Sequence, residues 1–338
     1  MPPAQQKATQ QSKPPPPANF ELAPTPLLFL GAFVGFMAIS IFAQRLFRPR
    51  TPKDWGDAAP LPKDGVLGRY KLGPLLADGG TATVYSGRDE NDTVVAIKIP
   101  HRGPLRNRSF VTTFEREAQI GVDLRHPSIV RVLHAGAYKA APFRRIPYFV
   151  MEYLEGQELD AILSRGPLSE QETIGVGRGV ADALQWAHAR GVIHRDISPR
   201  NIFITNRRAV KVMDFGISAV NERGSRAARA RGLAYGTPDY MAPERLVAAQ
   251  AADERSDLYA LGCVLYEMVS GAPPFRAESP EKTAMRHRKD PIPSLYEQGL
   301  SSREFDAIVT RLLAKSPRDR FQTAGEVTAK IADLLPHV

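Results

Sequence analysis

The stretch "GVIHRDISPRNIFI", Gly191–Ile204, places a carboxylate and an amide at a fixed spacing just before an apolar run. Asp196 follows a His-Arg pair, and Asn201 comes five residues later. A carboxylate can act as a base, and an amide oxygen can hold a hard cation. The stretch therefore predicts a catalytic loop. The residue two after Asp196 is Ser198, whose side chain is short and neutral, so this position of the loop supplies no positive charge.

Further motifs flank this loop in a fixed order. Upstream, "LLADGGTATVYSG" places a Gly-rich turn between two strand-like runs, and "VVAIKI" places Lys98 inside an apolar strand. Because burying a lone ammonium is costly, Lys98 needs a partner, and Glu117 on the next helical stretch is the candidate. Downstream come "DFG", starting at Asp214, and "APE", ending at Glu244. Each motif alone is common, but together, in this order and at these separations, they are specific.

In these motifs the sequence resembles the protein kinase family, most closely the bacterial eukaryotic-like (Hanks-type) Ser/Thr kinases. Other segments extend the likeness, among them "HPSIVRVL", "FVMEYLEGQEL", "GTPDYMAPERL", "SDLYALGCVLYEM" and "DRFQTAGEV". The resemblance implies an α+β, two-lobe protein-kinase fold in a kinase domain at 69–335. A β-rich N-lobe is expected at 69–151 and a helical C-lobe at 155–335.

Periodicity supports this order of strands before helices. Short β-branched runs at 93–99 and 147–154 predict strands, with one helical stretch at 110–124 between them. Four later stretches predict helices, at 172–191, 254–271, 302–315 and 323–335. A strand-rich part followed by a helical part is an α+β plan.

The resemblance implies ATP as phosphate donor and Mg²⁺ or Mn²⁺ as cofactor. Because charge spreads over the transferred phosphoryl group, the protein must position and neutralise that group rather than react covalently. Lys98 would bind the α- and β-phosphates, held in place by Glu117. Asp196 would orient and deprotonate the acceptor hydroxyl. Asn201 and Asp214 would hold the metal ions.

The resemblance also implies where the nucleotide binds. The expected pocket residues are Ala77, Gly79, Gly80, Ala82, Val84, Ala96, Lys98, Glu152 and Leu154. Met151 would be the gatekeeper, and backbone groups of Glu152 and Leu154 would hydrogen-bond adenine. Ala77 and Ala82 stand where the family usually has the first and third loop glycines. An added methyl group mildly restricts the turn but leaves its backbone donors intact.

Three more roles follow from the resemblance. Thr237 would hydrogen-bond Asp196, as a threonine does in Ser/Thr kinases, and this favours protein serine or threonine hydroxyls as acceptors. Glu244 is expected to pair with Arg320. Asp257 is expected to brace the catalytic loop.

Gly121 departs from the family pattern. It stands four residues after Glu117, where the family usually has an aliphatic side chain in its hydrophobic spine. Glycine costs roughly 1 kcal/mol relative to alanine inside a helix, and here it is expected to leave a gap beside Phe215. Gly121→Leu is therefore expected to raise basal activity, unless a neighbour such as Ile120 already fills the gap.

Ser198 is the third departure, after the alanines of the Gly-rich turn and Gly121, because it replaces the lysine that reaches the γ-phosphate in Ser/Thr kinases. Arg200, four residues after Asp196, is the expected substitute cation, since some tyrosine kinases place an arginine there. The alternative is that Arg200 faces solvent. Arg195 is expected to contact a phosphorylated residue of the activation loop, for which Ser225 is the candidate. The alternative is a basic loop that needs no phosphate.

The first 68 residues are unlike the rest. Residues 1–26 are rich in Pro and Gln and are expected to be disordered. Residues 27–43 carry no charge, and together with Leu46 and Phe47 they predict a transmembrane helix at 27–47. A buried core helix and a cleaved signal peptide are the alternatives. The segment lies between Pro-rich stretches, no basic region directly precedes it and no clear cleavage site follows it, which disfavours both. Residues 48–68 form a Pro-punctuated linker.

Charge near this segment predicts its orientation. Four basic residues closely follow it, namely Arg45, Arg48, Arg50 and Lys53. By the positive-inside rule, the chain would be a single-pass protein of the inner membrane with its kinase domain in the cytoplasm. Gly31 and Gly35 form a GxxxG pattern, a candidate homodimer face, although such patterns are common by chance.

Composition limits the other partners. The net charge of +9 would suit nucleic acid or anionic lipid. No helix-turn-helix, RNP or zinc-finger pattern occurs, so nucleic acid is not an expected partner. Cys263 is the only cysteine, which excludes an internal disulfide, and its apolar surroundings predict a buried side chain.

Two functions remain open from the sequence. The first is a membrane-tethered Ser/Thr protein kinase regulated by activation-loop autophosphorylation, and the presence of all five central residues favours it. The second is a pseudokinase that serves as an ATP-binding or interaction scaffold, which Ser198 and the two loop alanines favour.

Overall fold

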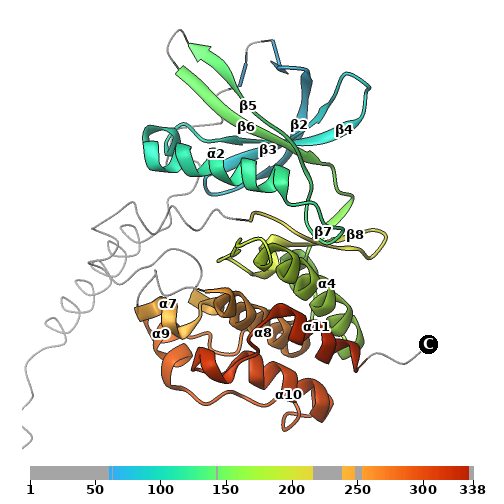
Figure 1. The fold of residues 1–338 in the computed structure, drawn as a ribbon, viewed down its shortest axis with the longest axis vertical. Coiled ribbons are helices and arrows are strands. Elements are labelled where there is room, and N and C mark those ends of the chain that lie inside the picture. The colour runs from blue at the N-terminus through green and yellow to red at the C-terminus, as the bar shows by residue number, and fades with distance from the viewer. Residues whose placement is uncertain (1–60, 63, 142–143, 216–237, 248–252, 335–338) are drawn as a thin grey trace, which may run out of the picture. The chain divides into compact units, whose positions relative to one another are not determined.

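Six antiparallel strands form a sheet in the first half of the chain. They are β1 (Val66–Leu67), β2 (Tyr70–Asp78), β3 (Ala82–Arg88), β4 (Val94–Pro100), β5 (Val132–Ala141) and β6 (Arg144–Glu152). Their order across the sheet is β1-β2-β3-β4-β6-β5 (Figure 1). The structure is a computed structural model, and it describes residues 61–62, 64–141, 144–215, 238–247 and 253–334.

The two faces of this sheet bury different side chains. Ile97 and Ile99 of β4 belong to a buried cluster on one face. Phe149 of β6 lies opposite Lys98 in register and packs on the other face against Phe114 of α2. Because side chains alternate along a strand, Lys98 points toward α2 while Ile97 and Ile99 point away.

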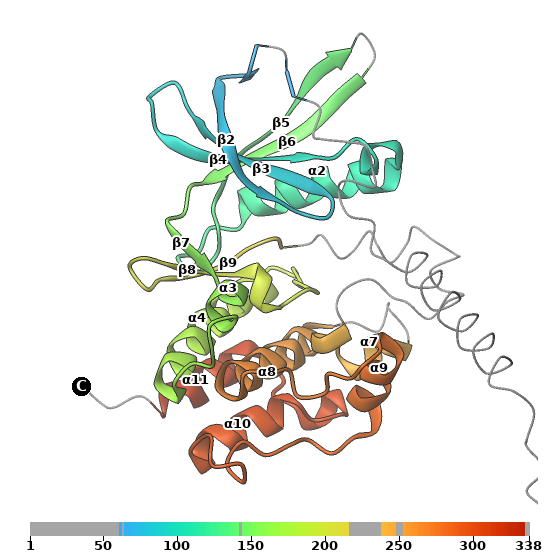
Figure 2. The ribbon, with the colours of Figure 1, turned by 180° about the vertical axis from the view of Figure 1, so that it is seen from behind.

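Helix α2 (Arg108–Asp123) covers this second face (Figure 2). It begins after Asn107, whose side chain accepts hydrogen bonds from the first turn of the helix. Its buried residues follow the spacing of one helix face, namely Phe114, Glu117, Ala118 and Gly121. This face directs Glu117 toward the strand that carries Lys98.

A second, three-stranded sheet follows the first. Its strands are β7 (Gly156–Glu158), β8 (Ile202–Thr205) and β9 (Val210–Val212), in that order. Gly156 has φ +154°, and a Cβ atom there would lie 2.1 Å from the carbonyl oxygen of Ile204, so only glycine fits. Strand β8 begins directly after Asn201, and β9 ends two residues before Asp214. The β8–β9 pairing therefore sets the separation of these two residues.

Helices are the main elements of the remaining described residues. They are α3 (Leu159–Leu163), α4 (Glu170–His188), α7 (Pro243–Val247), α8 (Glu254–Ser270), α9 (Pro280–Lys289), α10 (Arg303–Leu312) and α11 (Ala324–Ala332). Short 3-10 turns are η2 (Pro104–Arg106), η3 (Pro199–Asn201), η4 (Pro238–Tyr240) and η6 (Pro317–Asp319).

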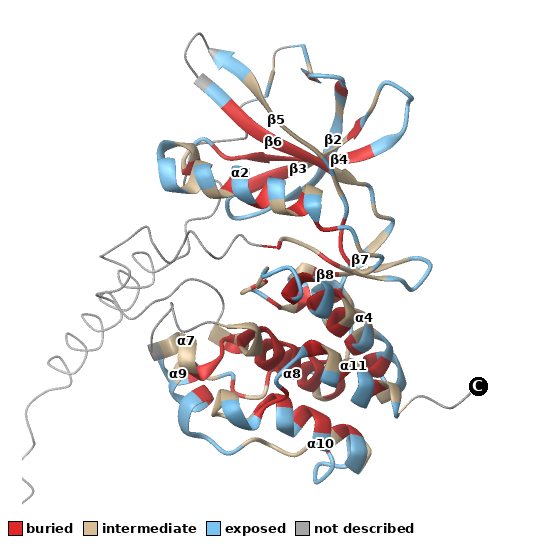
Figure 3. Ribbon diagram, in the orientation of Figure 1, coloured by how far each residue is buried: buried red, intermediate tan, exposed pale blue. Residues whose placement is uncertain are grey.

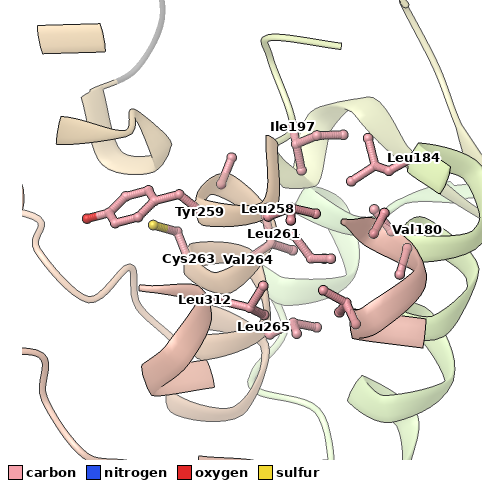
Figure 4. Packing of buried hydrophobic residues seen from close by; sticks show 14 of the residues in the cluster. Val180, Leu184, Ile197, Leu258, Tyr259, Leu261, Cys263, Val264, Leu265 and Leu312 are labelled. Atoms are coloured by element: carbon pink, nitrogen blue, oxygen red, sulfur yellow. The ribbon is translucent and has the colours of Figure 1, made fainter. Parts of the chain in front are cut away.

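Helix α8 lies at the centre of this helical part. Every residue from Ser256 to Val269 is buried (Figure 3). A helix that is apolar on all sides must be enclosed by other elements, and α4 and α10 contact it. Figure 4 shows Leu258 and Leu261 of α8 in one cluster with Val180 and Leu184 of α4. This core provides a rigid base for the loops that precede and follow β8.

The predicted fold is confirmed in its main features. Strands precede helices, and the five predicted helices appear as α2, α4, α8, α10 and α11. Cys263 is fully buried, as expected, and burial raises the pKa of its thiol. The predicted tail, transmembrane helix and most of the linker lie outside the described residues. Among the residues that are described, no helix is both long and apolar enough to cross a bilayer. The predicted domain limits stay predictions.

Candidate active site

Lys98 lies between two carboxylates. Its Nζ atom is 2.6 Å from Oδ1 of Asp214 and 3.8 Å from Oε1 of Glu117. Lys98 is 8% exposed and Glu117 is 5% exposed, so their charges rely on each other rather than on water. The predicted partner Glu117 is present, but Asp214 is the nearer one. The group brings together a strand, a helix and the segment after β9.

Burial controls the protonation of this group. Desolvation raises the pKa of Glu117 to about 8, where Asp214 adds to the rise and Lys98 opposes it. Burial alone would lower the pKa of Lys98, but Asp214 and Glu117 outweigh it and raise that pKa. Lys98 therefore stays charged, while Glu117 gains or loses its proton near neutral pH.

Asp196 and Asn201 are joined by two hydrogen bonds. Nδ2 of Asn201 donates to the backbone oxygen of Asp196 at 2.8 Å and to its Oδ2 atom at 3.0 Å. Since Nδ2 is directed at Asp196, the amide oxygen of Asn201 points elsewhere. The Asp196 side chain remains accessible to solvent. Partial desolvation raises the pKa of Asp196, and His194 and Asn201 oppose that rise.

Asp257 of α8 holds the start of the catalytic loop. Its Oδ2 atom accepts hydrogen bonds from the backbone N–H of His194 at 2.8 Å and from Nε2 of His188 at 2.9 Å. Its Oδ1 atom accepts from the backbone N–H of Arg195 at 2.7 Å. Burial alone would raise the pKa of Asp257, but His188 and the other donors lower it. The predicted brace is confirmed.

His194 connects the catalytic loop to the segment after β9. Its Nε2 atom donates to the carbonyl oxygen of Met213 at 2.7 Å, and its Nδ1 atom accepts from the backbone N–H of Asp196 at 3.2 Å. The ring also packs edge-on against Phe215, with centroids 4.6 Å apart. These contacts fit the neutral tautomer with its proton on Nε2.

Two residues of the site have positive φ angles. Arg195 has φ 69° and Asp214 has φ 60°, a region that non-glycine residues rarely adopt. Such backbone persists only where surrounding contacts impose it, and it is concentrated at functional sites. Here the contacts are those of Asp257 with Arg195 and of Lys98 with Asp214.

The Gly-rich turn joins β2 to β3. The backbone N–H of Gly79 donates to the carbonyl oxygen of Ala82 at 3.0 Å. Ala82 is 4% exposed and packs with Phe114 and Phe149. By contrast, a Cβ atom on Gly80 would meet no atom within 4 Å. One end of the turn is thus packed into the sheet, while its tip is open.

Other predicted nucleotide-pocket residues lie in one row across the sheet. Ala77 of β2 is opposite Val84 of β3, and Val84 is opposite Lys98 of β4. Ala96 lies two residues before Lys98 and is therefore on the same face. This row faces the side of the sheet that α2 covers.

Glu152 ends β6 and begins the connection to the second sheet. Its Oε1 atom accepts from the backbone N–H of Arg131 at 2.9 Å and from Nζ of Lys211 at 2.7 Å. Lys211 lies on β9, so this ion pair links the end of the first sheet to the second. Nothing in the sequence indicated Lys211, because a three-residue strand has no periodicity to read. Leu154, two residues further, is half-buried.

Comparison with known families gives a single assignment. The protein kinase domain family matches residues 70–330 of this chain. The chain belongs to the protein kinase family. The resemblance predicted from the sequence is thereby confirmed, since the curated relatives described next are bacterial.

Three curated relatives carry the name serine/threonine-protein kinase PknB. They come from Mycobacterium tuberculosis (42% identity over 268 residues), Mycobacterium leprae (41% over 269) and Mycolicibacterium smegmatis (40% over 267). Each match covers 78% of this chain and 42% of the relative. The chain thus spans less than half the length of these relatives.

Val132 occupies the position that a side chain at Gly121 of the kinase domain would take, although a small cavity lined by Gly121 and Phe215 remains. A Cβ atom at Gly121 would lie 2.4 Å from Cγ2 of Val132 and 3.1 Å from its Cβ atom. Val132 of β5, rather than Ile120, therefore fills the place of the family's aliphatic side chain. A leucine has no room there unless Val132 moves, so the expected gain in activity from Gly121→Leu, which stays a prediction, would require Val132 to shift toward other space.

A small cavity does remain nearby. Its volume is about 30 Å³, and it lies between α2, the first sheet and Phe215. Its lining includes Glu117, Gly121, Leu124, Val132, Phe149, Met151, Asp214 and Phe215. The predicted gatekeeper Met151 therefore lines the same cavity as Glu117 and Asp214, on the face of the sheet that α2 covers.

Arg200 lies in η3, next to the catalytic loop. Its side chain is 72% exposed, and its Nε atom is 3.8 Å from Oδ2 of Asp160. An exposed pair at this separation holds a side chain only weakly. Ser198 directly precedes η3, and its carbonyl oxygen accepts from the backbone N–H of Asn201 at 3.0 Å. The role of Arg200 as a substitute cation stays a prediction.

The predicted pair of Glu244 and Arg320 is confirmed. The Arg320 guanidinium donates to Oε1 of Glu244 at 2.8 Å and to Oε2 at 2.7 Å. Burial alone would raise the pKa of Glu244, but Arg320 lowers it. Two other predicted residues, Thr237 and Ser225, lie outside the described residues.

Proposed function

We propose that this chain is a membrane-tethered protein kinase that transfers the γ-phosphate of ATP to serine and threonine hydroxyls of proteins. The observation that carries the proposal is Lys98 held between Glu117 and Asp214. A fixed cation beside a carboxylate is what phosphoryl transfer requires, because that reaction is governed by positioning and charge.

The residues present fit a magnesium-bound nucleotide. Mg²⁺ is usually held by one or two carboxylates together with substrate phosphates, and it prefers oxygen ligands. Asp214 offers a carboxylate, and Asn201 offers the amide oxygen that is turned away from Asp196. Among the described residues, no group of three or more His, Cys, Asp or Glu side chains could hold a metal alone. A bound Mg²⁺ would neutralise phosphate charge.

The chain's own groups supply the other steps. Lys98 would orient the α- and β-phosphates, with Glu117 behind it. Asp196 would accept the proton of the attacking hydroxyl, and its exposed carboxylate is reachable from solvent. Thr237 would fix that carboxylate relative to the acceptor.

Transfer of radiolabelled phosphate by the full chain tests this function. Wild-type protein should label a generic protein substrate, and Asp196→Asn should lower the rate at least about 100-fold while ATP still binds. Asp319→Asn, an exposed change far along the chain, should be neutral. A wild-type chain that binds ATP but transfers no phosphate would establish the scaffold alternative, which Ser198 and the alanines in the Gly-rich turn favour.

Arg200 is proposed as the cation that replaces the usual lysine. Its weak contact with Asp160 leaves the side chain able to reach a phosphate. Loss of one stabiliser of transition-state charge typically costs about 10²–10³ in rate, so Arg200→Ala should lower kcat on that order without changing ATP affinity. Ser198→Lys should restore turnover in that variant. Full activity in Arg200→Ala would refute the substitution.

Regulation by autophosphorylation is proposed at Ser225. Arg195 is anchored at its backbone by Asp257, which makes it a fixed place for a phosphate to bind. Mass spectrometry of active protein should find phosphate on Ser225. An unmodified Ser225 in active protein would exclude this site.

Anchoring by residues 27–47 is proposed from the sequence pattern. The N-terminal tail would lie outside the inner membrane and the kinase domain in the cytoplasm, where ATP is. Protease added to spheroplasts should leave the kinase domain intact. Digestion of the kinase domain by this external protease would show that the orientation is the opposite one. A homodimer through Gly31 and Gly35 should be lost in Gly31→Leu, as judged by crosslinking in membranes.

A further inference from the structure

A buried polar triangle lies behind the Gly-rich turn. The Nε2 atom of His101 is 2.9 Å from Oγ1 of Thr83 and 3.0 Å from Oδ1 of Asp78. The Thr83 hydroxyl in turn donates to the same Asp78 oxygen at 2.9 Å. His101 is 1% exposed and Thr83 is 3% exposed. No residue of this triangle belongs to the phosphate-transfer machinery described above.

Strand register explains why the three side chains meet. Asp78, the last residue of β2, lies opposite Thr83 of β3, and Thr83 lies opposite Ile99 of β4. His101 directly follows β4, and its backbone N–H donates to the carbonyl oxygen of Thr81 at 2.9 Å. Through its ring and its backbone, His101 therefore contacts both sides of the turn.

The protons of the triangle can be assigned without conflict. An ionised Asp78 accepts from the Thr83 hydroxyl and from a proton on Nε2 of His101. Losing Asp78 would remove the acceptor that both donors share, and the bond between Thr83 and His101 would then no longer reach the end of β2. The triangle therefore ties the end of β2 to the end of β4.

The turn depends on such a tie because little else holds its first half. Ala82, where β3 begins, is packed against the side chains beneath α2. Asp78, where β2 ends, is exposed, and its carboxylate is 44% accessible. The open space around Gly80 shows that the tip has no packing of its own. The triangle adds side-chain contacts on the Asp78 side to the backbone pairing of β2 with β3.

We propose that His101, Thr83 and Asp78 are positioning residues that hold the tip of the Gly-rich turn in place, so that the backbone N–H groups of Gly80 and Thr81 can bind the phosphates of a nucleotide while the Gly79 N–H stays bonded to Ala82. The inference rests on the proposed function for the identity of the ligand. The triangle acts from the opposite face of the sheet to Lys98, because Thr83 alternates with Val84, and it does not touch the nucleotide.

Nucleotide binding by the full chain tests the proposal without requiring phosphate transfer. Fluorescent mant-ADP with Mg²⁺ is the probe. Asp78→Ala and Thr83→Val should each raise its Kd about 5–10-fold, the loss expected for one buried hydrogen bond. Asp78→Asn keeps the acceptor oxygen and should stay within about twofold of wild type. Glu90→Ala, which removes an exposed ion pair with Arg69 in the same sheet, is the matched control.

Two more readouts separate positioning from general stability. Hydrogen–deuterium exchange at the Gly79 amide should accelerate about tenfold in Asp78→Ala, whereas exchange in α2 should stay unchanged. In active protein, the KM for ATP should rise with the Kd while kcat changes less than about twofold. A Kd and a Gly79 exchange rate equal to wild type in Asp78→Ala and Thr83→Val would overturn the proposal. A chain that binds mant-ADP but transfers no phosphate would defeat the proposed function and leave this test intact.

Discussion

Asp257 of α8 and Glu117 of α2 are both buried carboxylates that support the active site, but their surroundings differ. Asp257 accepts three hydrogen bonds of 2.7–2.9 Å, two of them from backbone N–H groups of the catalytic loop. Glu117 faces Lys98 at 3.8 Å, and Lys98 lies closer to Asp214. The pKa of Asp257 is lowered by its donors, whereas burial raises the pKa of Glu117 to about 8.

This difference distinguishes a fixed part of the site from an adjustable one. Backbone donors stabilise the ionised form of Asp257 and cannot move away, because the loop and α8 are both packed into the helical core. Glu117 relies on a single lysine, Lys98, which a second carboxylate binds more closely. We infer that the catalytic loop is set by the fold, while the α2 side of the site responds to protonation and to whatever binds Lys98.

Removing the fixed carboxylate should have the largest effect. Asp257→Ala leaves the backbone N–H groups of His194 and Arg195 buried without their acceptor, which should lower the free energy of unfolding by about 3–5 kcal/mol. Chemical denaturation measures this loss, and phosphate transfer should disappear with it. Asp319→Asn, an exposed change in the same helical part, serves as control. Stability within about 1 kcal/mol of wild type would show that the loop does not depend on Asp257.

Removing the charge of the adjustable carboxylate, Glu117, should raise the unfolding free energy rather than lower it. The folded-state pKa of Glu117 lies above the ordinary value of about 4.3, so the folded protein favours the protonated form. Its contribution is present in full at low pH and is lost as pH rises toward about 8. Glu117→Gln removes this titration, so its unfolding free energy should exceed that of wild type by a few kcal/mol at pH 8 and by much less at pH 5.

Asp257 should affect the unfolding free energy in a different pH range from Glu117. Its lowered pKa means that its contribution is present above about pH 4 and is lost as the pH falls further. Denaturation of wild type and Glu117→Gln between pH 5 and 8 therefore isolates Glu117. Parallel curves over that range would mean that Glu117 is already ionised in the folded protein. The same variant should transfer phosphate more slowly at every pH.

Packing behind Glu117 offers a smaller test of the adjustable side. Gly121→Leu forces a side chain against Val132, and such overpacking typically costs about 1–3 kcal/mol. Val132→Ala should restore much of that stability when combined with Gly121→Leu, because the new side chain then fills the vacated space. Thermal melts of the two single variants and the double variant measure the coupling. Additive losses would mean that the two side chains do not compete for one place.

The sequence predicted the fixed side of the site better than the adjustable one. Asp257 and the Glu244–Arg320 pair were located from motifs, and α8 was recognisable because its apolar residues continue around the whole helix. Helix α9 was not predicted, since only Thr283 and His287 are buried in it and no apolar periodicity results. Val132 and Lys211 act through contacts with residues distant in the chain, and the spacing of residues in the sequence does not predict such contacts. The same holds for the triangle at His101.

Glu152 combines the two kinds of contact seen at Asp257 and at Glu117, and a change at its lysine partner should have the smallest effect on stability. It accepts one backbone N–H, like Asp257, and one lysine ammonium, like Glu117. Its side chain is 29% exposed and that of Lys211 is 16% exposed, so water can replace part of a lost contact. Lys211→Met should therefore lower the unfolding free energy by only about 1 kcal/mol.

The more informative readout for Lys211→Met is local. If the ion pair holds the end of β6 to β9, hydrogen exchange at the Glu152 amide should accelerate several-fold, while exchange in α8 should not change. Lys330→Met, which removes an exposed pair with Asp333, should leave both rates unaltered. Unchanged exchange at Glu152 in Lys211→Met would mean that the backbone pairing with Arg131 is sufficient. Glu152 would then belong with Asp257 among the carboxylates that the fold holds through backbone donors.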